Sequence, residues 1–277
     1  MVSKKALTQR LSEGTISFTS SLVEQALYSD TLRPLVMREM EKRLLAEVKA
    51  KADPRRPQQV LEDKLDMVRA LLHSVDRALE RRLISRPVLH RLLASFLGNA
   101  VLVQDQGAKA ARRSFSERHG LRVPPTVMVI SPTKACNLRC VGCYANSGPE
   151  VEQLEWDVFD RILSEAKDLW GMRFFTISGG EPLVYRSQGK GLLDMVAKHH
   201  DCFFQMYTNG TLIGPEVAER LAELGNLVPA ISVEGFKERT DQRRGDGIYD
   251  RILAAMANLR QAGVPFGISL TGTRYNA

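Results

Sequence analysis

The sequence predicts an α/β fold, an open parallel sheet or partial barrel that follows a helical region. Two observations carry this prediction. Short apolar runs alternate with amphipathic stretches after residue 120, whereas apolar residues recur every three or four positions over residues 21–103. Parallel strands need crossover helices, which are almost always right-handed, so the order β, α, β, α indicates a parallel sheet covered by helices.

The composition is that of a folded globular protein. The chain has 277 residues, of which 44% are hydrophobic and 26% are charged, and this excludes disordered, collagen-like and disulfide-scaffold classes. The length suits one large domain or two unequal ones. The longest apolar run, residues 88–103, is interrupted by His90, Arg91 and Asn99, so we expect no membrane span.

Charge is distributed unevenly along the chain. Residues 1–120 hold 22 Lys and Arg against 14 Asp and Glu, a net charge of +8, whereas residues 121–277 hold 17 against 18, a net charge of −1. Such a basic region suits contact with nucleic acid or an anionic membrane. Basic side chains interleaved with acidic ones along helices are more often a solvated surface, and we favour that interpretation.

Residues 1–120 are predicted to be a helical, basic N-terminal region that ends in a linker. The prolines of residues 53–57 break the helical pattern, and Pro87 begins a further helix. Residues 104–125 lose periodicity and are predicted to be the linker, which places a domain boundary near residue 120. The clearest helical stripe consists of Leu61, Leu65, Val68, Leu71, Leu72 and Val75.

Residues 121–277 are predicted to form the α/β core. Amphipathic helices separate the strands, and the Gly, Cys and polar clusters fall where strands end. Functional groups in such folds gather at the carboxyl ends of the strands. The five predicted strands are residues 126–131, 173–178, 203–208, 228–233 and 266–271.

A loop after the first predicted strand holds three cysteines. Cys136, Cys140 and Cys143 are separated by three and then two residues, and polar side chains flank them. A loop this tight can wrap one compact metal centre, and thiolate is the preferred ligand of zinc and iron-sulfur clusters. Structural zinc needs a fourth ligand, and the Cys and His residues of 199–202 lie near the opposite end of a strand. We therefore expect an open metal site, with plain core packing as the weaker alternative.

The three cysteines resemble the CxxxCxxC signature of the radical S-adenosylmethionine (radical SAM) superfamily. The resemblance implies that Cys136, Cys140 and Cys143 hold three irons of a 4Fe-4S cluster, and that the amino and carboxylate groups of S-adenosylmethionine chelate the fourth iron. It also implies reductive cleavage of S-adenosylmethionine to a 5′-deoxyadenosyl radical that abstracts hydrogen from a substrate. Gly142 stands where the family often has an aromatic residue that contacts adenine, and Tyr144 is the nearby aromatic candidate.

The second predicted strand ends in a segment that resembles the family's Gly-Gly-Glu motif. Glycines allow a close backbone approach to a ligand and positive φ angles. The resemblance implies that Gly179 and Gly180 offer backbone groups to the methionine ammonium. It implies that Glu181 fixes that group, either directly or by shaping the turn.

Later strand ends carry the remaining candidates. The resemblance implies that Asn209, Ser232 and Glu234 line the cosubstrate site, with ordinary turn chemistry as the alternative. Residues 241–245 resemble an Asp-x-x-Arg-Gly segment, which implies that Arg244 pairs with the S-adenosylmethionine carboxylate. A solvated loop arginine is the competing interpretation. The fourth thiol, Cys202, is predicted to be a small buried hydrophobe.

The resemblance covers residues 126–277 and implies a partial (β/α)6-type barrel, truncated after its fifth strand. It implies an enzyme that acts on an unknown peptide or small-molecule substrate and takes electrons from a low-potential donor such as ferredoxin or flavodoxin. The clustered cysteines and the lack of a recognisable leader predict a reducing, cytoplasmic compartment. The alternative is a non-catalytic iron-sulfur or zinc binding module whose basic helical region contacts nucleic acid or a membrane.

Overall fold

The computed structural model describes residues 22–50, 52, 54–95, 106–120, 124–125, 127–149 and 152–272. The chain divides into two compact units, Met1–His90 and Arg91–Ala277. The second unit begins earlier than the predicted core, which begins at residue 121. Three parts of the predictions lie outside the described residues. They are Asp53 in the predicted helix break, Thr126 at the start of the first predicted strand, and residues 273–277 at the end of the predicted core.

The first unit contains helices α2 (Arg33–Ala50), α3 (Gln58–Glu80) and the beginning of α4 (Arg86–Ser95). Helix α3 buries Leu65, Leu72 and Leu79, which are spaced seven residues apart and therefore share one face. The buried guanidinium of Arg33 forms ion pairs with Asp30 at 2.9 Å and Asp76 at 3.2 Å, so its charge is not left unpaired. The predicted helical periodicity of this region is confirmed.

The second unit is built around a five-stranded parallel sheet, which confirms the predicted α/β class. Neighbouring strands follow the order β1-β2-β5-β6-β7, and every adjacent pair is parallel. All five predicted strands are present. They are β1 (Met128–Ile130), β2 (Phe174–Ile177), β5 (Phe203–Thr208), β6 (Leu227–Ser232) and β7 (Gly267–Ser269).

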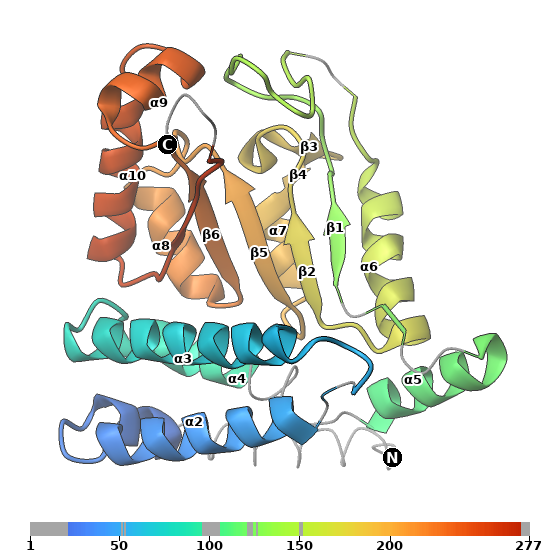
Figure 1. Cartoon of the computed structure of the whole chain (residues 1–277). Helices are drawn as coiled ribbons and strands as arrows, with labels where there is room; N and C mark the ends of the chain where they lie inside the picture. The colour runs from blue at the N-terminus through green and yellow to red at the C-terminus, as the bar shows by residue number, and fades with distance from the viewer. Residues whose placement is uncertain are drawn as a thin grey trace, which may run out of the picture. The chain divides into compact units, whose positions relative to one another are not determined.

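Helices cover one face of this sheet (Figure 1). Helices α7 and α8 lie behind the strands, and α6 and α10 flank them. Helix α6 ends at Gly171, which adopts a left-handed conformation with φ of 63°, a common way to stop a helix. The helices of the second unit are α5 (Gln106–His119), α6 (Trp156–Trp170), α7 (Leu192–Lys198), α8 (Pro215–Leu224), α9 (Lys237–Arg244) and α10 (Ile248–Gln261).

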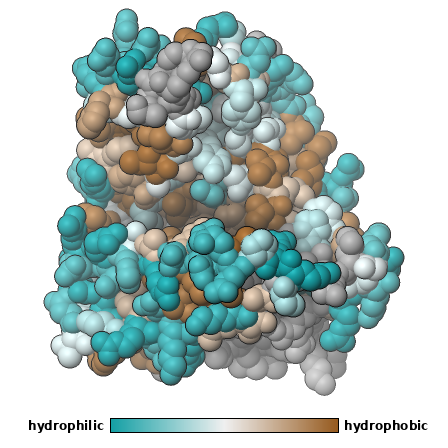
Figure 2. Space-filling model, viewed as in Figure 1, coloured by the Kyte–Doolittle hydropathy of each residue, from teal (hydrophilic) through white to brown (hydrophobic). Residues whose placement is uncertain are grey.

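The core of the second unit lies between the sheet and these helices. Phe175 and Phe204 pair across β2 and β5, their rings stack 5.8 Å apart, and both are fully buried. The opposite face of the sheet carries the row Val129, Thr176 and Gln205. Apolar side chains gather in a shallow hollow over that face (Figure 2). None of the residues in the five strands is charged.

Two elements differ from the sequence-based expectation. Helix α5 occupies much of the predicted linker, residues 104–125, and it packs on α6, where Phe115 meets Trp170 edge to face at 6.4 Å. Its Ala- and Arg-rich sequence lacks a continuous apolar stripe, so periodicity gave no signal. The hairpin of β3 (Arg186–Ser187) and β4 (Lys190–Gly191) is too short to leave a pattern.

Among the helices that the structure describes, none combines the length and the hydrophobicity that a membrane span requires.

Candidate functional site

The three clustered cysteines lie on the loop that follows β1, at the carboxyl end of the sheet. Cys136, Cys140 and Cys143 are partly buried free thiols, and all three line one pocket. The base of the loop is fixed because the Cys136 N–H donates to the Gly148 carbonyl at 2.6 Å. A turn in which the Cys143 N–H donates to the Cys140 carbonyl at 3.2 Å brings the last two thiols to the same side.

The pocket gathers ten of the eleven residues that the sequence analysis selected. Glu234 is the exception, because it lies behind Arg244 rather than in the lining. The predicted residues in the lining are Cys136, Cys140, Cys143, Tyr144, Gly179, Gly180, Glu181, Asn209, Ser232 and Arg244. The lining also contains Ser147, Ser178, Tyr207, Thr208 and Arg243.

The Gly179-Gly180 turn packs backbone against backbone on the segment that leads to Cys136. Gly179 has a φ of +101°, and a Cβ atom there would lie 2.8 Å from the Thr133 carbonyl oxygen. A Cβ atom on Gly180 would overlap the carbonyl oxygen of Ala135. Only glycine satisfies both the positive φ and the close approach. The glycine carbonyl oxygens accept no hydrogen bond within the described part of the chain.

Glu181 shapes this turn with a fully engaged carboxylate. Its Oε1 accepts hydrogen bonds from the Leu183 N–H at 3.2 Å and the Thr208 hydroxyl at 2.8 Å, and its Oε2 accepts from the Asn209 N–H at 2.8 Å. Burial raises the pKa of Glu181, and these hydrogen bonds oppose that rise. Of the two roles that the resemblance left open, the geometry favours shaping the turn.

Asn209 connects the end of β5 to the cysteine loop. Its Nδ2 donates to the Asn137 Oδ1 at 2.9 Å and lies 3.9 Å from the Cys136 sulfur. Its Oδ1 accepts hydrogen bonds from the N–H and hydroxyl of Thr211 at 2.9 and 2.7 Å. The side chain is therefore held on both ends, as a pocket wall next to Cys136.

Glu234 holds two arginines from the last turn of α9. Its Oε1 lies 2.6 Å from Arg244 Nη2, and its Oε2 lies 2.7 Å from Arg243 Nη1. Arg244 Nη1 also lies 4.0 Å from the Cys140 sulfur. The Nε atom of Arg244 is buried and has no hydrogen-bond partner among the described residues. Arg244 is thus a largely buried, paired side chain, not a solvated loop arginine.

Tyr144 and Ser178 contact each other in the lining of the pocket. The Tyr144 hydroxyl and the Ser178 hydroxyl are 2.7 Å apart, and the Gly179 N–H donates to the Tyr144 oxygen at 3.3 Å. The Tyr144 residue is nevertheless 80% exposed, so its ring is accessible beside the Gly-Gly turn. Ser232 reaches the same pocket from the end of β6.

The three thiols differ in their electrostatic surroundings. Burial raises the pKa of Cys136 and of Cys140, because a thiolate loses solvation there. Burial acts in the same direction on Cys143, but N–H groups of Ser147, Ala145 and Asn146 outweigh it and lower that pKa. Since thiolate is the metal-binding form, the Cys143 position is already arranged to stabilise an anionic sulfur.

Comparison with known proteins identifies the family. Residues 130–276, just over half of the chain, match the family described as the Radical SAM superfamily. This chain belongs to the radical SAM superfamily.

Curated relatives of this radical SAM chain are similar over its second half. It is 32% identical to Fe-coproporphyrin III synthase of Methanosarcina barkeri, over 54% of this chain and 38% of that protein. It is 36% identical to mycofactocin maturase MftC of Mycolicibacterium smegmatis, over 55% of this chain and 39% of that protein. The chain therefore spans well under half the length of the curated relatives it matches.

A solved structure, Streptococcus suis SuiB bound to its precursor peptide SuiA, has a TM-score of 0.49 to this chain. It is 22% identical over 61% of this chain and 38% of that chain.

The cofactors of the radical SAM superfamily are a 4Fe-4S cluster and S-adenosylmethionine, and the residues in the pocket fit them. Three thiols converge from one loop, and the pocket lining that the structure describes contains no fourth Cys or His. An iron with an open position therefore suits the site better than tetrahedral zinc. The buried, unpartnered Arg244 Nε supplies a donor for an anionic group such as the cosubstrate carboxylate.

Sequence reasoning missed several residues of this radical SAM pocket. Ser178 and Thr208 are strand-end residues beside selected ones, so their position was a usable signal. Arg243 gave no signal of its own, because its contacts to the cysteine loop depend on the tertiary position of α9.

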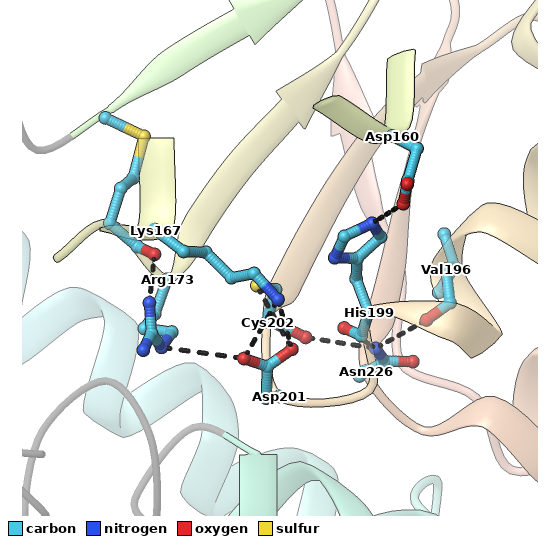
Figure 3. A network of polar contacts seen from close by, with 9 residues as sticks. Asp160, Lys167, Arg173, Val196, His199, Asp201, Cys202 and Asn226 are labelled. Carbon is cyan, nitrogen blue, oxygen red and sulfur yellow. Dashed lines mark hydrogen bonds and ion pairs between the residues drawn. The ribbon is translucent and has the colours of Figure 1, made fainter. Parts of the chain in front are cut away.

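Cys202, the fourth cysteine of the radical SAM chain, does not line the pocket and lies at the amino end of β5. Figure 3 shows it within a network of polar contacts. It is fully buried, as predicted, and burial raises its pKa to about 12. His199, Asp201 and Cys202 bring ligand atoms within 4.8 Å of one another. The Lys167 ammonium, however, contacts both Asp201 carboxylate oxygens at 3.1 and 3.2 Å, so this cluster already contains its cation.

Proposed function

We propose that the second unit is the catalytic core of a radical SAM enzyme, in which Cys136, Cys140 and Cys143 ligate the 4Fe-4S cluster. The observation that carries this proposal is one pocket that contains all three thiols together with polar groups from the ends of β2, β5 and β6. The bound cluster and S-adenosylmethionine supply one-electron cleavage to a 5′-deoxyadenosyl radical that abstracts hydrogen from the substrate.

The protein's part in this chemistry is to hold and orient the cosubstrate. Gly179 and Gly180 leave backbone carbonyls for its ammonium group, and Glu181 keeps that turn in place. The Arg244 Nε donates to its carboxylate, while Glu234 fixes the guanidinium. Their distribution over several strand ends is the arrangement expected of a parallel α/β enzyme.

The remaining polar and aromatic residues of the pocket bind the ribose and the adenine of the cosubstrate. Ser232 and Asn209 offer a hydroxyl and an amide from neighbouring strand ends, next to the cysteine loop. Tyr144 offers an accessible ring whose hydroxyl is anchored to Ser178. We assign Tyr144 to the adenine, in place of the aromatic residue that Gly142 replaces.

The substrate is a peptide or a cofactor precursor. Curated relatives carry names of both kinds, a mycofactocin maturase and a Fe-coproporphyrin III synthase. The uncharged strands of the open sheet face provide apolar and neutral polar contacts rather than ion pairs. The electron donor is a low-potential ferredoxin or flavodoxin, and the thiols and cluster favour a reducing, cytoplasmic setting.

The non-catalytic binding module is the weaker function. It leaves unexplained why the pocket joins the thiols to the Gly-Gly turn and Arg244. The curated relatives reported above are a maturase and a synthase, which are enzymes.

Anaerobic reconstitution of the 277-residue chain tests the proposal. We expect about four irons per chain and, with dithionite and S-adenosylmethionine, formation of 5′-deoxyadenosine. Cys140→Ala should lose both, whereas the matched control Cys202→Ala should keep both, because Cys202 lies outside the pocket. One tightly bound zinc per chain, or a full cluster that yields no 5′-deoxyadenosine, would contradict the enzyme assignment.

A further inference from the structure

The middle of the cysteine loop is attached to the rest of the second unit by one helix end. Between Leu138 and Gly142, every hydrogen bond that the structure describes to a residue outside the loop comes from Arg243 or Arg244. Cys140 lies within this stretch. The two outer cysteines have other contacts. The Cys136 N–H donates to the Gly148 carbonyl, and the Cys143 N–H donates within a turn to the Cys140 carbonyl.

Arg243 holds both polar groups of Val141, the residue that follows Cys140. The Val141 N–H donates to the Arg243 carbonyl at 2.8 Å, and the Arg243 Nε donates to the Val141 carbonyl at 3.2 Å. The last carbonyls of a helix have no partner within the helix, so the end of α9 is free to accept this bond. Val141 is 71% exposed, and its hydrogen bonds to Arg243 are made by its backbone, so the loop is held here by its backbone.

The Arg243 guanidinium is itself fixed by a buried carboxylate. Its Nη1 lies 2.7 Å from Glu234 Oε2, and the Glu234 side chain is only 3% exposed. A planar guanidinium presents Nε and Nη1 in fixed directions, so one side chain contacts the loop and Glu234 at the same time. Lysine has a single ammonium on a flexible stem and lacks this geometry.

We propose that Arg243 is a positioning residue for the iron-sulfur cluster, which sets the place of Cys140 by clamping the Val141 peptide between α9 and the loop. This inference rests on the proposed function of the three cysteines. It concerns this chain's own contacts, which exist without the cluster. The neighbouring Arg244 lies 4.0 Å from the Cys140 sulfur and does not contact the Val141 backbone, so in this proposal Arg243 holds the loop and Arg244 is left for the cosubstrate.

The first test uses the iron-free protein. Cys140 and Cys136 are alkylated with iodoacetamide, and the modification of each is followed by mass spectrometry. Loss of the Arg243 charge raises the Cys140 pKa and so lowers its thiolate fraction, and the rates are therefore compared per thiolate, from their pH dependence. On that scale, Cys140 should react roughly ten-fold faster in Arg243→Gln than in the wild type, the factor expected from the loss of one hydrogen bond from a charged donor. Cys136 should keep its rate. Arg239→Gln, an exposed position on the same helix, is the matched control and should change neither.

The second test uses the reconstituted protein and measures iron loss to a chelator. Arg243→Gln should lose iron roughly ten-fold faster than the wild type, and Arg243→Lys should fall between them. The electron paramagnetic resonance spectrum of the reduced cluster should change in Arg243→Gln and not in Arg239→Gln. Wild-type alkylation and iron-loss rates in Arg243→Gln would overturn the proposal.

Two further outcomes distinguish a failure of this proposal from a folding defect and from a failure of the proposed function. If Arg243→Gln unfolds at a lower temperature than the wild type, the alkylation is repeated with Arg243→Lys, which keeps a positive charge next to Glu234 but lacks the planar fork that reaches the Val141 carbonyl. Faster reaction of Cys140 than in the wild type, with an unchanged rate at Cys136, supports the clamp, and wild-type rates at both cysteines overturn it. If the wild type takes up no iron-sulfur cluster, the proposed function fails, while the alkylation result still decides whether Arg243 holds the loop.

Discussion

At the scale of single residues, the site depends on buried carboxylates that are paired with donors or cations before any ligand arrives. The Glu181 carboxylate accepts hydrogen bonds from three donors, and the Glu234 carboxylate forms ion pairs with two guanidinium groups. A buried carboxylate costs free energy unless such partners surround it. Both residues therefore fix other groups, and in the proposed function the glycine carbonyls and the Arg244 Nε contact the cosubstrate.

Gly180→Ala tests the close approach of the Gly-Gly turn. The added methyl would overlap the Ala135 carbonyl, so we expect a loss of about 1–3 kcal/mol in the free energy of unfolding. Iron uptake on reconstitution should fall with it, because Ala135 precedes Cys136. Gly267→Ala, where an added methyl meets open space, should leave thermal stability and iron content unchanged.

Glu181→Gln tests the carboxylate that holds the turn. The substitution replaces one accepting oxygen by a donating amide in a site where all three partners are donors. We expect a loss of about 1–3 kcal/mol in the free energy of unfolding, the cost of a buried group left without its hydrogen bond. Denaturant unfolding of the iron-free protein measures it, and an unchanged midpoint would show that the carboxylate does not hold the turn.

At the scale of elements, strands that are short, apolar and followed by glycine or polar residues were predictable. All five predicted strands form the parallel sheet, because their pattern is local. Helix α5 was not predictable, because its sequence has no apolar stripe and its packing on α6 is a tertiary contact. The cysteines and the Gly-Gly turn were identifiable from their spacing. The clamp of Arg243 on Val141 was not, because residues far apart in sequence meet there only after folding.

The segment between α7 and β5 should make stability depend on pH. Burial, together with the Lys167 ammonium, lowers the pKa of His199 below its usual 6.5. Because the folded pKa is lower than the unfolded one, the stabilisation is present above pH 6.5 and is lost as the pH falls through the folded pKa. Burial disfavours the ionised form of Asp201, but Lys167 outweighs burial and lowers the pKa of that carboxyl. The protein should therefore lose further stability as the pH falls below 3.8, the ordinary Asp pKa.

Thermal unfolding of His199→Gln and the wild type checks the first of these windows. Glutamine retains a donor toward Asp160, which lies 2.9 Å from His199 Nε2, but does not titrate. The wild-type free energy of unfolding should fall between pH 7 and pH 5 with a slope of up to about 1.4 kcal/mol per pH unit, the thermal midpoint should fall with it, and the variant's slope should be shallower. His200→Gln, at an exposed neighbour, is the control. An identical slope in His199→Gln and wild type would contradict the assignment.

At the scale of the whole molecule, the candidate functional residues gather at one end of one sheet. The cysteine loop, the Gly-Gly turn and the end of α9 come from segments far apart in the sequence, yet they line one pocket at the carboxyl ends of the strands. The polar cluster at Cys202 lies away from that pocket and serves the fold. This separation is why Cys202 is a suitable control for every experiment on the other three thiols.

In the proposed function, three thiolates hold a cluster whose remaining iron binds S-adenosylmethionine. The most direct measurement is the electron paramagnetic resonance spectrum of the reduced, reconstituted chain, recorded before and after S-adenosylmethionine is added. We predict a cluster signal that shifts when the cosubstrate binds, and no such signal in Cys140→Ala. A signal that S-adenosylmethionine leaves unchanged, or a metal centre ligated by four protein groups, would contradict the account.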